Sequence, residues 1–327
     1  MVYSFILLAL GLGLLVAGGN WFVDGSAGLA RLFNVRPLII GVVVIGFGTS
    51  APEMLVSLFA VIDGKGGIAV GNIVGSNIAN IGLVMAAAAI IYPLAVHTNV
   101  LRKELPLTAL MTLIFGALIM VDGTLDVFDG VVLLLAFVAM MAYVVGIPGL
   151  PGGNKREQQQ LDAEAAEMIV ESPVVVIPRR PLVAIGQTLL GLALILVGAQ
   201  LTVEHASSIA RELGVSDAII GLTLVAVGTS LPELVAAVIA SWKRQTELIV
   251  GNVLGSNIYN LGAIGGLVGL FSGSGMQIGD ALRFGSMIVM GVLTLLLLPV
   301  LYRGSRMDRL EGTLIVAGYT VYMVLLF

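Results

Sequence analysis

One cluster of polar residues occurs twice in this chain, each time inside apolar sequence. The copies comprise residues 48–53 (GTSAPE) with 75–80 (GSNIAN), and residues 228–233 (GTSLPE) with 255–260 (GSNIYN). Aligning residues 10–80 with 190–260 needs no gap and gives 26 identities in 71 positions, at a constant offset of 180. Shared hydrophobicity alone does not bring hydroxyls, amides and carboxylates into register. The chain therefore contains a duplicated unit, and any fold must accommodate both copies.

The composition favours a polytopic membrane protein, because 58% of the 327 residues are hydrophobic and only 11% are charged. A helix needs about 20 apolar residues to cross a bilayer. The apolar runs predict an all-α integral membrane protein with ten transmembrane helices, near 3–23, 38–62, 67–91, 104–121, 128–147, 182–203, 217–241, 247–271, 281–301 and 310–327. The first run lacks a basic n-region and a small-residue cleavage site, so we expect a retained helix rather than a signal peptide.

The ten predicted spans form two five-helix repeats, residues 1–147 and 182–327, with the polar motifs within 41–80 and 221–260. Because each repeat has an odd number of helices, the two copies enter the membrane in opposite senses. Inverted repeats of this kind place the binding site of many secondary transporters between the copies, near the bilayer midplane. The sequence therefore predicts a site where the two motifs meet.

Residues 148–181 interrupt the apolar pattern with a Pro/Gly-rich start and a polar, acidic stretch. We expect a cytoplasmic linker with one short surface helix. The alternative is a calcium-sensing role for Asp162, Glu164 and Glu167, but their spacing does not match an EF-hand loop.

The basic residues indicate the orientation of the chain. If the N-terminus faces out, the outer loops hold only Lys65, Arg211 and Arg283 of the 16 basic residues. The other 13 then lie in the inner loops: Arg31, Arg36, Arg102, Lys103, Lys155, Arg156, Arg179, Arg180, Lys243, Arg244, Arg303, Arg306 and Arg309. Short cytoplasmic loops carry an excess of Lys and Arg, so both termini are predicted to be extracytoplasmic. The chain has no cysteine, which excludes disulfides and thiolate metal sites.

Glu53 and Glu233 are the only two of the 20 acidic residues that fall well inside predicted spans. A carboxylate at mid-membrane costs a few kcal/mol, and such residues usually face a bundle interior or a water-filled cavity. A pair of protonated glutamates that are hydrogen-bonded for packing is the alternative. The matched positions of the two residues beside matched prolines favour a function.

The prolines explain how a site can form at this depth. Pro52 has no N–H, so the carbonyl of Gly48 loses its helical partner, and Pro232 does the same to Gly228. Unwound backbone within the membrane is tolerated where protein buries it or where it lines a cavity. Freed carbonyls, hydroxyls and a carboxylate within one turn make an oxygen-rich lining, although a kink for packing alone is also compatible with these prolines.

The second motif adds hydroxyls and amides on one helix face, because positions four apart share a face. These are Ser76 with Asn80 and Ser256 with Asn260, which serve either as ion contacts or as hydrogen bonds between helices. For the glycines at 71, 75, 251 and 255, small-xxx-small spacing favours close helix packing over a ligand role. The remaining asparagines, at 72, 77, 252 and 257, are expected to support local helix geometry.

The donor set is made only of oxygens, with two carboxylates of total charge −2. Hard cations prefer such a set, and Ca²⁺ accepts six to eight oxygens in flexible geometry. His97 and His205 lie near span ends outside the motifs, so a transition-metal site is disfavoured. An intramembrane hydrolase is also disfavoured, because the motif serines have no His or Lys beside them within the spans.

At these residues the sequence resembles the calcium/cation antiporter superfamily, specifically its prokaryotic sodium/calcium exchanger branch. The paired G-T-S-x-P-E and G-S-N-I-x-N/D motifs mark its alpha repeats. The resemblance implies liganding side chains at Thr49, Ser50, Glu53, Ser76, Asn80, Thr229, Ser230, Glu233, Ser256 and Asn260, with backbone carbonyls at Gly46 and Ala226. It also implies that the first and sixth helices, rich in glycine, slide across the core to switch access. Many relatives have Asp where this chain has Asn260, so the charge here rests on two glutamates.

The resulting functional prediction is a secondary antiporter, not an enzyme, that exchanges Na⁺ for Ca²⁺ by alternating access in the inner membrane of a prokaryote. It has the two ions as substrates, the bilayer as its surroundings, and no cofactor, nucleic acid or obligate protein partner. A Ca²⁺/H⁺ exchanger is the alternative, since a carboxylate pair can bind protons. A cation channel is a further alternative, although conduction needs weak, multi-site binding.

Overall fold

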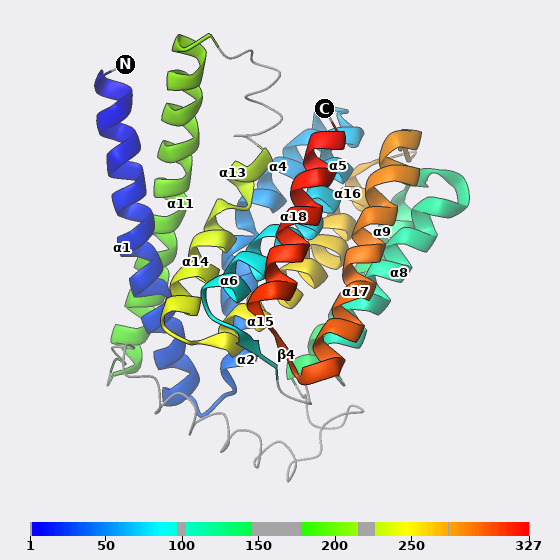
Figure 1. Ribbon diagram of the computed structural model, residues 1–327. Coiled ribbons are helices and arrows are strands. Elements are labelled where there is room, and N and C mark those ends of the chain that lie inside the picture. Colours follow the sequence, from blue (N-terminus) through cyan, green and yellow to red (C-terminus); the bar gives the residue numbers. More distant parts are fainter. Residues whose placement is uncertain are drawn as a thin grey trace.

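The computed structural model describes residues 2–96, 103–145, 178, 180–214, 226–273 and 275–326. They form a helical bundle in which both ends of the chain lie at the same end of the molecule (Figure 1). We call this the terminal end and the other the opposite end. The first half comprises α1 (Val2–Leu32), α2 (Pro37–Ile40), the π-helix η1 (Gly41–Gly46), α3 (Phe47–Thr49), α4 (Ala51–Ile62), α5 (Gly66–Ala79), η2 (Asn80–Met85), α6 (Ala86–Ile91), β1 (Leu94–Ala95), α8 (Glu104–Asp122), β2 (Thr124–Leu125) and α9 (Val127–Val145).

The second half repeats this order of elements where it is described. It comprises α11 (Pro181–Glu212), α13 (Ala226–Thr229), α14 (Leu231–Trp242), α15 (Thr246–Ile258), η4 (Tyr259–Ile264), α16 (Gly265–Phe271), β3 (Met276–Gln277), η5 (Ala281–Ser286), α17 (Met287–Gly304), β4 (Arg306–Met307) and α18 (Arg309–Leu325). The short helix expected in the 148–181 linker lies outside the described residues, and so does His97.

Seven helices in the described part of the chain are long and apolar enough to cross a membrane, and a bent pair, Pro37–Thr49 with Ala51–Ile62, adds an eighth. The two other predicted spans are 217–241, which begins outside the described residues, and 310–327, where α18 has 17 residues. The expectation of a helical, multi-pass membrane protein is thus confirmed.

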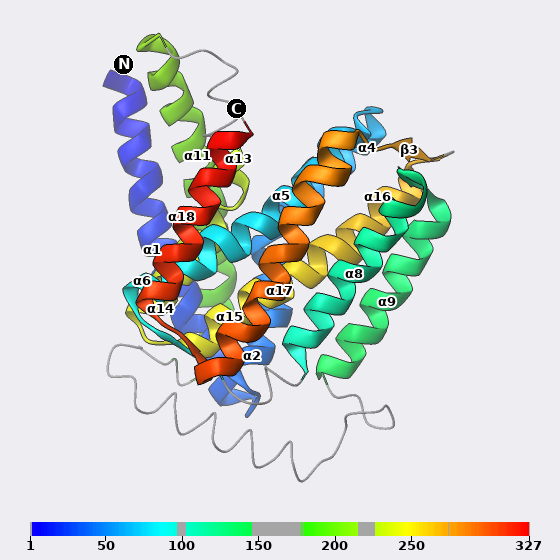
Figure 2. The same cartoon turned by 45° about the vertical axis from the view of Figure 1, so that its right-hand side comes forward.

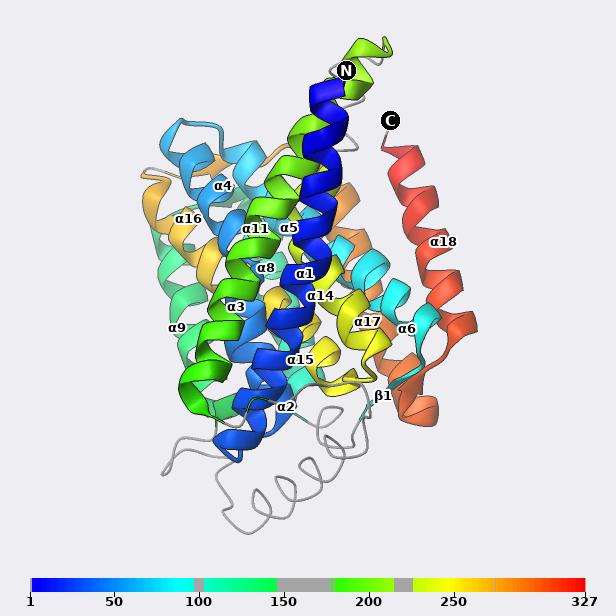
Figure 3. The same cartoon turned by 90° about the vertical axis from the view of Figure 1, so that its left-hand side faces the viewer.

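The helices at the first and sixth predicted spans extend beyond the predicted ends. We expected 3–23 and 182–203, whereas α1 has 31 residues and α11 has 32. Both helices continue through polar residues beyond the predicted ends. Adding a turn to an existing helix is favourable, and each helix covers the added turns of the other. The two lie side by side along one flank of the bundle (Figures 1 and 3).

Glycine allows α1 and α11 to approach this closely. A Cβ at Gly18 would lie 2.8 Å from the carbonyl oxygen of Gly191, and a Cβ at Gly198 would lie 2.8 Å from that of Gly11. These two contacts are counterparts, since 11 + 180 = 191 and 18 + 180 = 198. Small residues at both faces let the helix backbones touch.

The helices that carry the G-S-N motifs lie deepest. In Gly66–Ile91 and in Thr246–Phe271, 78% of the most apolar window is buried, against 28–44% in the other long helices. Figure 2 shows α5 and α15 in the middle of the bundle, with α8, α9, α17 and α18 around them. The polar residues of both motifs are thereby placed in the interior.

Two short antiparallel ribbons, absent from the sequence-based expectations, join the halves. Leu94 pairs with Met307 in the β1–β4 ribbon, and Leu125 pairs with Met276 in the β2–β3 ribbon. The figures show β4 at the opposite end and β3 at the terminal end (Figures 1 and 2). Runs of two residues carry no periodicity that a sequence pattern could reveal.

Candidate functional site

Both G-T-S-x-P-E motifs break their helices at the serine. Ser50 has φ −81° and ψ 4°, and Ser230 has φ −87° and ψ 7°. Each proline then falls in the first turn of the next helix, where a missing N–H costs no helical hydrogen bond. In the first copy the axis bends by 45° at this point. The break places Glu53 and Glu233 in the first turns of α4 and α14.

Three π-helical turns also adjoin the motifs: η1 ends at Gly46, η2 begins at Asn80, and η4 contains Asn260. Single π-turns inside α-helices occur frequently at functional sites, because the wider turn leaves carbonyls poorly paired. The sequence predicted the proline breaks but not these turns, for which it offers no distinct signal.

Hydrogen bonds connect the two motif copies directly. The Ser50 hydroxyl donates to Glu233 Oε1 at 3.3 Å, and the Asn80 amide donates to Asn257 Oδ1 at 3.0 Å. Thr49 Oγ1 lies 3.0 Å from the Ile45 carbonyl oxygen and 3.3 Å from Asn252 Oδ1. The first copy therefore contacts the second through side chains 177 to 203 positions apart.

The predicted carbonyl ligand at Gly46 already accepts two hydrogen bonds. The Ser50 N–H donates to it at 3.1 Å and the Ser256 hydroxyl at 3.4 Å. A cation at this oxygen would compete with Ser256. Ala226, the counterpart of Gly46, is the first residue of α13.

The two glutamates are each only 1% exposed and lie close enough for their charges to interact. Both oxygens of Glu53 and Oε2 of Glu233 have no hydrogen-bond partner among the described residues. The same holds for Asn80 Oδ1, for Ser230 Oγ, and for both amide atoms of Asn260. Burying polar oxygens without partners is costly, so their concentration here indicates a site for a cation.

Three of the predicted hydroxyl residues lie beside these carboxylates. The Ser76 hydroxyl lies beside Glu53, and Thr49 and Ser50 lie beside Glu233. Thr229 is half-buried at the end of α13. No group of three or more His, Cys, Asp or Glu side chains in the described ranges is arranged so that it could hold a metal ion by itself. The donors are thus two carboxylates with neutral hydroxyl and amide oxygens, a set that suits Ca²⁺ or Na⁺.

Some supporting asparagines do more than the sequence indicated. Asn77 Nδ2 donates to the Ile73 carbonyl at 2.7 Å, as expected for support of the local helix. Asn72 donates to the Glu53 carbonyl and to Ser57, a residue that the sequence analysis missed. Asn252 and Asn257, by contrast, bond to the other motif copy, and only tertiary structure could reveal that.

The expected packing role of the motif glycines is confirmed for Gly251 and Gly255. A Cβ at Gly255 would lie 2.7 Å from the Val42 Cα, and one at Gly251 would clash with the Leu38 carbonyl oxygen. The second copy is thus tightly packed against α2 and η1. In the other half, the positions that correspond to Leu38 and Val42 are residues 218 and 222, which lie outside the described residues.

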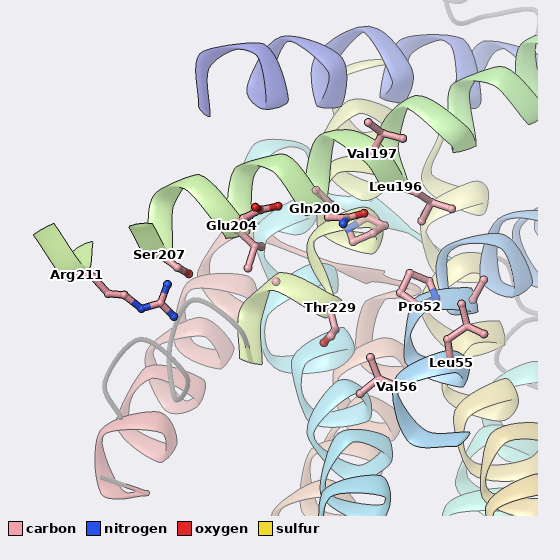
Figure 4. A pocket seen from close by; sticks show the side chains of 15 residues that line it. Pro52, Leu55, Val56, Leu196, Val197, Gln200, Glu204, Ser207, Arg211 and Thr229 are labelled. Atoms are coloured by element: carbon pink, nitrogen blue, oxygen red, sulfur yellow. The ribbon is translucent and has the colours of Figure 1, made fainter. Parts of the chain in front are cut away.

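A cavity of about 730 Å³ lies between α11 and the start of α4 (Figure 4). Its lining is mostly apolar, with Gln200 and Glu204 of α11 projecting from one side and Pro52 and Leu55 of α4 from the other. It also reaches Thr229, a predicted ligand. The cavity thus touches the candidate site at Thr229.

His205 is 8% exposed on α11, and its ring lies edge-on to Tyr3 at 5.8 Å. It is separate from the glutamates, as the sequence predicted.

Comparisons with known proteins agree with this geometry. The family model described as "Sodium/calcium exchanger protein" matches residues 3–146 and 183–327. The chain is 38% identical to the putative antiporter CaxA of Alkalimonas amylolytica, covering 100% of this chain and 99% of that one. It is 33% identical to the inner membrane protein YrbG of Escherichia coli, covering 100% and 98%.

Among solved structures, the sodium–calcium exchanger NCX_Mj soaked with Na⁺ and Sr²⁺ superposes with a TM-score of 0.81 at 32% identity, over 99% of this chain and 98% of that one. The matches to the family model and to these relatives span both motif copies and the helices between them. The chain belongs to the sodium/calcium exchanger family.

Proposed function

We propose that this protein exchanges Na⁺ for Ca²⁺ across the membrane by alternating access, with the two ions competing for the oxygens around Glu53 and Glu233. The observation that carries the proposal is the pair of fully buried carboxylates, of which three oxygens have no partner among the described residues. A total charge of −2 balances one Ca²⁺ or two Na⁺. Because both ions bind the same oxygens, the transport of one is coupled to the transport of the other. As a member of an exchanger family, the protein is a transporter rather than an enzyme, and no cofactor is needed for this role.

The ligands that we propose are the residues singled out by sequence: the side chains of Thr49, Ser50, Glu53, Ser76, Asn80, Thr229, Ser230, Glu233, Ser256 and Asn260, and the carbonyls of Gly46 and Ala226. Glu53 and Glu233 supply the charge, and the neutral oxygens complete the coordination that a desolvated cation needs. Hydroxyls such as Ser50 and Ser256 can rotate from their present acceptors toward an ion.

We further propose ten spans arranged as two inverted repeats, residues 1–147 and 182–327, joined by the cytoplasmic linker 148–181. The two ribbons support the inversion. Leu94 of the first half corresponds to Met276 of the second, and Met307 of the second half corresponds to Leu125 of the first, each at an offset of 182. The Leu94–Met307 pair of one ribbon is therefore the counterpart of the Leu125–Met276 pair of the other. Because the ribbons lie at opposite ends of the bundle, the axis relating them runs across the helices, as in other inverted-repeat transporters (Figures 1 and 2).

The distribution of basic residues supports an orientation with both termini outside, which makes the terminal end extracytoplasmic. The name of the relative YrbG supports placement in an inner membrane. The cavity between α11 and α4 then faces outward. On the opposite side, α1 packs along α14, where a Cβ at Gly19 would lie 2.9 Å from the Ile239 side chain. The conformation therefore corresponds to access from outside.

Sodium coupling is tested by ⁴⁵Ca²⁺ uptake into proteoliposomes with Na⁺ and H⁺ gradients imposed separately. We expect an outward Na⁺ gradient to drive Ca²⁺ accumulation and a pH gradient alone to drive none. Protein-free liposomes and liposomes with equal Na⁺ on both sides are the controls. Uptake that follows the pH gradient and ignores Na⁺ would instead establish the second candidate, a Ca²⁺/H⁺ exchanger, which the proximity of two buried carboxylates favours. Single-channel currents in a planar bilayer would contradict both and indicate a channel.

The bond between Asn80 and Asn257 predicts a role for Asn257 in ion affinity. Its Oδ1 accepts the Asn80 amide N–H, which leaves Asn80 Oδ1 available to a cation. In Asn257→Leu that acceptor is lost, and the KM for Ca²⁺ should rise about tenfold, the effect of one buried hydrogen bond. Asn20→Leu is the control, since the Asn20 side-chain amide donates to the Val16 carbonyl oxygen of its own helix, away from the motifs. An unchanged KM in Asn257→Leu would show that Asn80 is not a ligand or does not need this bond.

A further inference from the structure

Outside the candidate ion site, the described residues contain a buried ion pair that joins the two halves of the chain. Asp24 Oδ1 of α1 lies 2.7 Å from Lys243 Nζ, at the end of α14, with side-chain exposures of 11% and 8%. The same ammonium group lies 3.4 Å from the Asn20 carbonyl oxygen. A charge this deeply buried is tolerated only when it is paired, and removing one partner leaves the other uncompensated.

The ion pair lies where α1 closes on the core. Lys243 follows α14 at the opposite end, and Gly19 and Asp24, five residues apart on α1, both contact the α14 region. Val23, beside Asp24, is fully buried. No part of the ion pair belongs to the motifs, so ion binding does not explain its presence.

The corresponding positions of the other half carry a different charge pattern. With the offset of 180, Asp24 corresponds to Glu204 and Lys243 to Asp63. Both counterparts are acidic, so the equivalent ion pair cannot form. Glu204 lines the open cavity together with Ala199, the counterpart of Gly19 (Figure 4). Asp63 is exposed and lies 3.4 Å from Lys65.

The packing of the helices differs between the two halves in the same way as the charges. Where the ion pair exists, α1 and α14 are in contact; where its counterpart is missing, α11 and α4 are separated by the cavity. In an inverted-repeat protein the opposite access state is obtained by exchanging the conformations of the halves. That state would close α11 on α4 and bring Glu204 toward Asp63, two carboxylates that repel each other.

We propose that the Asp24–Lys243 ion pair is a latch that holds the cytoplasmic side closed and biases the exchanger toward the outward-open state. The proposal rests on the proposed function, since it assumes alternating access. Its consequence is that the two access states have unequal populations even without ions. The ion pair stabilises the outward-open state, and the repulsion between two carboxylates destabilises the opposite state. The equilibrium between the two states shifts by the difference between these two free energies.

The natural absence of cysteine permits a direct test by single-cysteine labelling. Val203→Cys places a thiol in the cavity, and Val23→Cys places one at the counterpart position, which is buried here. Each reporter is labelled with a membrane-impermeant maleimide in proteoliposomes and in detergent, without Na⁺ or Ca²⁺. With the latch intact, Val203→Cys should react fast and Val23→Cys slowly.

Asp24→Asn or Lys243→Gln should slow labelling of Val203→Cys and accelerate that of Val23→Cys, each by about threefold or more. The charge swap Asp24→Lys with Lys243→Asp should restore both rates. Asp63→Lys, which leaves the buried pair intact and supplies the missing partner for Glu204, should also slow Val203→Cys labelling. Asp280→Asn, an exposed carboxylate elsewhere, is the control and should change neither rate.

The latch is refuted if the neutral variants run as monodisperse protein yet leave the ratio of the two labelling rates unchanged. It is equally refuted if both reporters accelerate together, which would mean that the pair only stabilises the fold. Should the neutral variants fail to fold, Asp63→Lys decides alone: an unchanged Val203→Cys rate overturns the proposal. Because labelling needs no transport, a failure here is separable from a failure of Na⁺/Ca²⁺ exchange.

Discussion

Glu53→Gln and Glu233→Gln should each reduce Na⁺-dependent ⁴⁵Ca²⁺ uptake by about 100-fold or more, equivalent to roughly 2.7 kcal/mol in ion binding. Glutamine keeps the size of the side chain and one oxygen but removes half of the cage charge. A desolvated Ca²⁺ would then face a single carboxylate, which leaves one of its two charges uncompensated. Leaving a buried charge without a partner has a large free-energy cost. Uptake at a range of Ca²⁺ concentrations, with isothermal titration on the detergent-solubilised protein, separates affinity from turnover.

Glu104→Gln is the matched control for these variants. Glu104 is also 1% exposed, but its carboxylate pairs with Arg36 at 3.0 Å rather than with the motif residues. This variant should lower the unfolding temperature while leaving the KM for Ca²⁺ unchanged. Retention of more than half of the uptake in Glu53→Gln or Glu233→Gln would rule out the proposed ligand role of that residue.

Gly255→Ala should lower transport at least about tenfold and destabilise the protein by roughly 1–3 kcal/mol, the usual effect of overpacking. The added Cβ would stand 2.7 Å from the Val42 Cα, and backbone atoms cannot turn away as a flexible side chain can. The clash would push α15 from η1 and displace Ser256, which bonds to the Gly46 carbonyl. Thermal unfolding in detergent and initial ⁴⁵Ca²⁺ uptake rates measure the two effects.

Gly116→Ala is the control, because Gly116 lies in the middle of α8 and a Cβ there meets no described atom within 4 Å. We expect near-normal stability and transport for Gly116→Ala. Equal losses in the two variants would show that the contact with Val42 is not the cause.

Much of the site was predictable because its chemistry is local in sequence. A proline two residues after a serine, followed by a glutamate in apolar surroundings, predicts a broken helix with a buried carboxylate, and Ser50 and Ser230 show that break. The duplication added the expectation that both copies meet. Asn80 and Asn257, bonded across the halves, fulfil it.

Other features depended on contacts that no local pattern records. The length of α1 and α11 follows from their mutual coverage through paired glycines, not from their hydrophobicity. The bonds that Asn252 and Asn257 make across the interface, and the partners of Gly251 and Gly255, depend on which surfaces the helices present to each other.

The sequence alone determined that the chain is duplicated, that it spans a membrane, and which oxygens lie within its spans. These properties follow from residue type and spacing along the chain. Only the tertiary structure decided which of the two equivalent sides is closed. Asp24 and Lys243 are 219 positions apart and form an ion pair, whereas their counterparts Glu204 and Asp63 are both acidic and form none with each other. The physical reason is that two related copies adopt different packing, because α1 packs along α14 whereas a cavity lies between α11 and the start of α4.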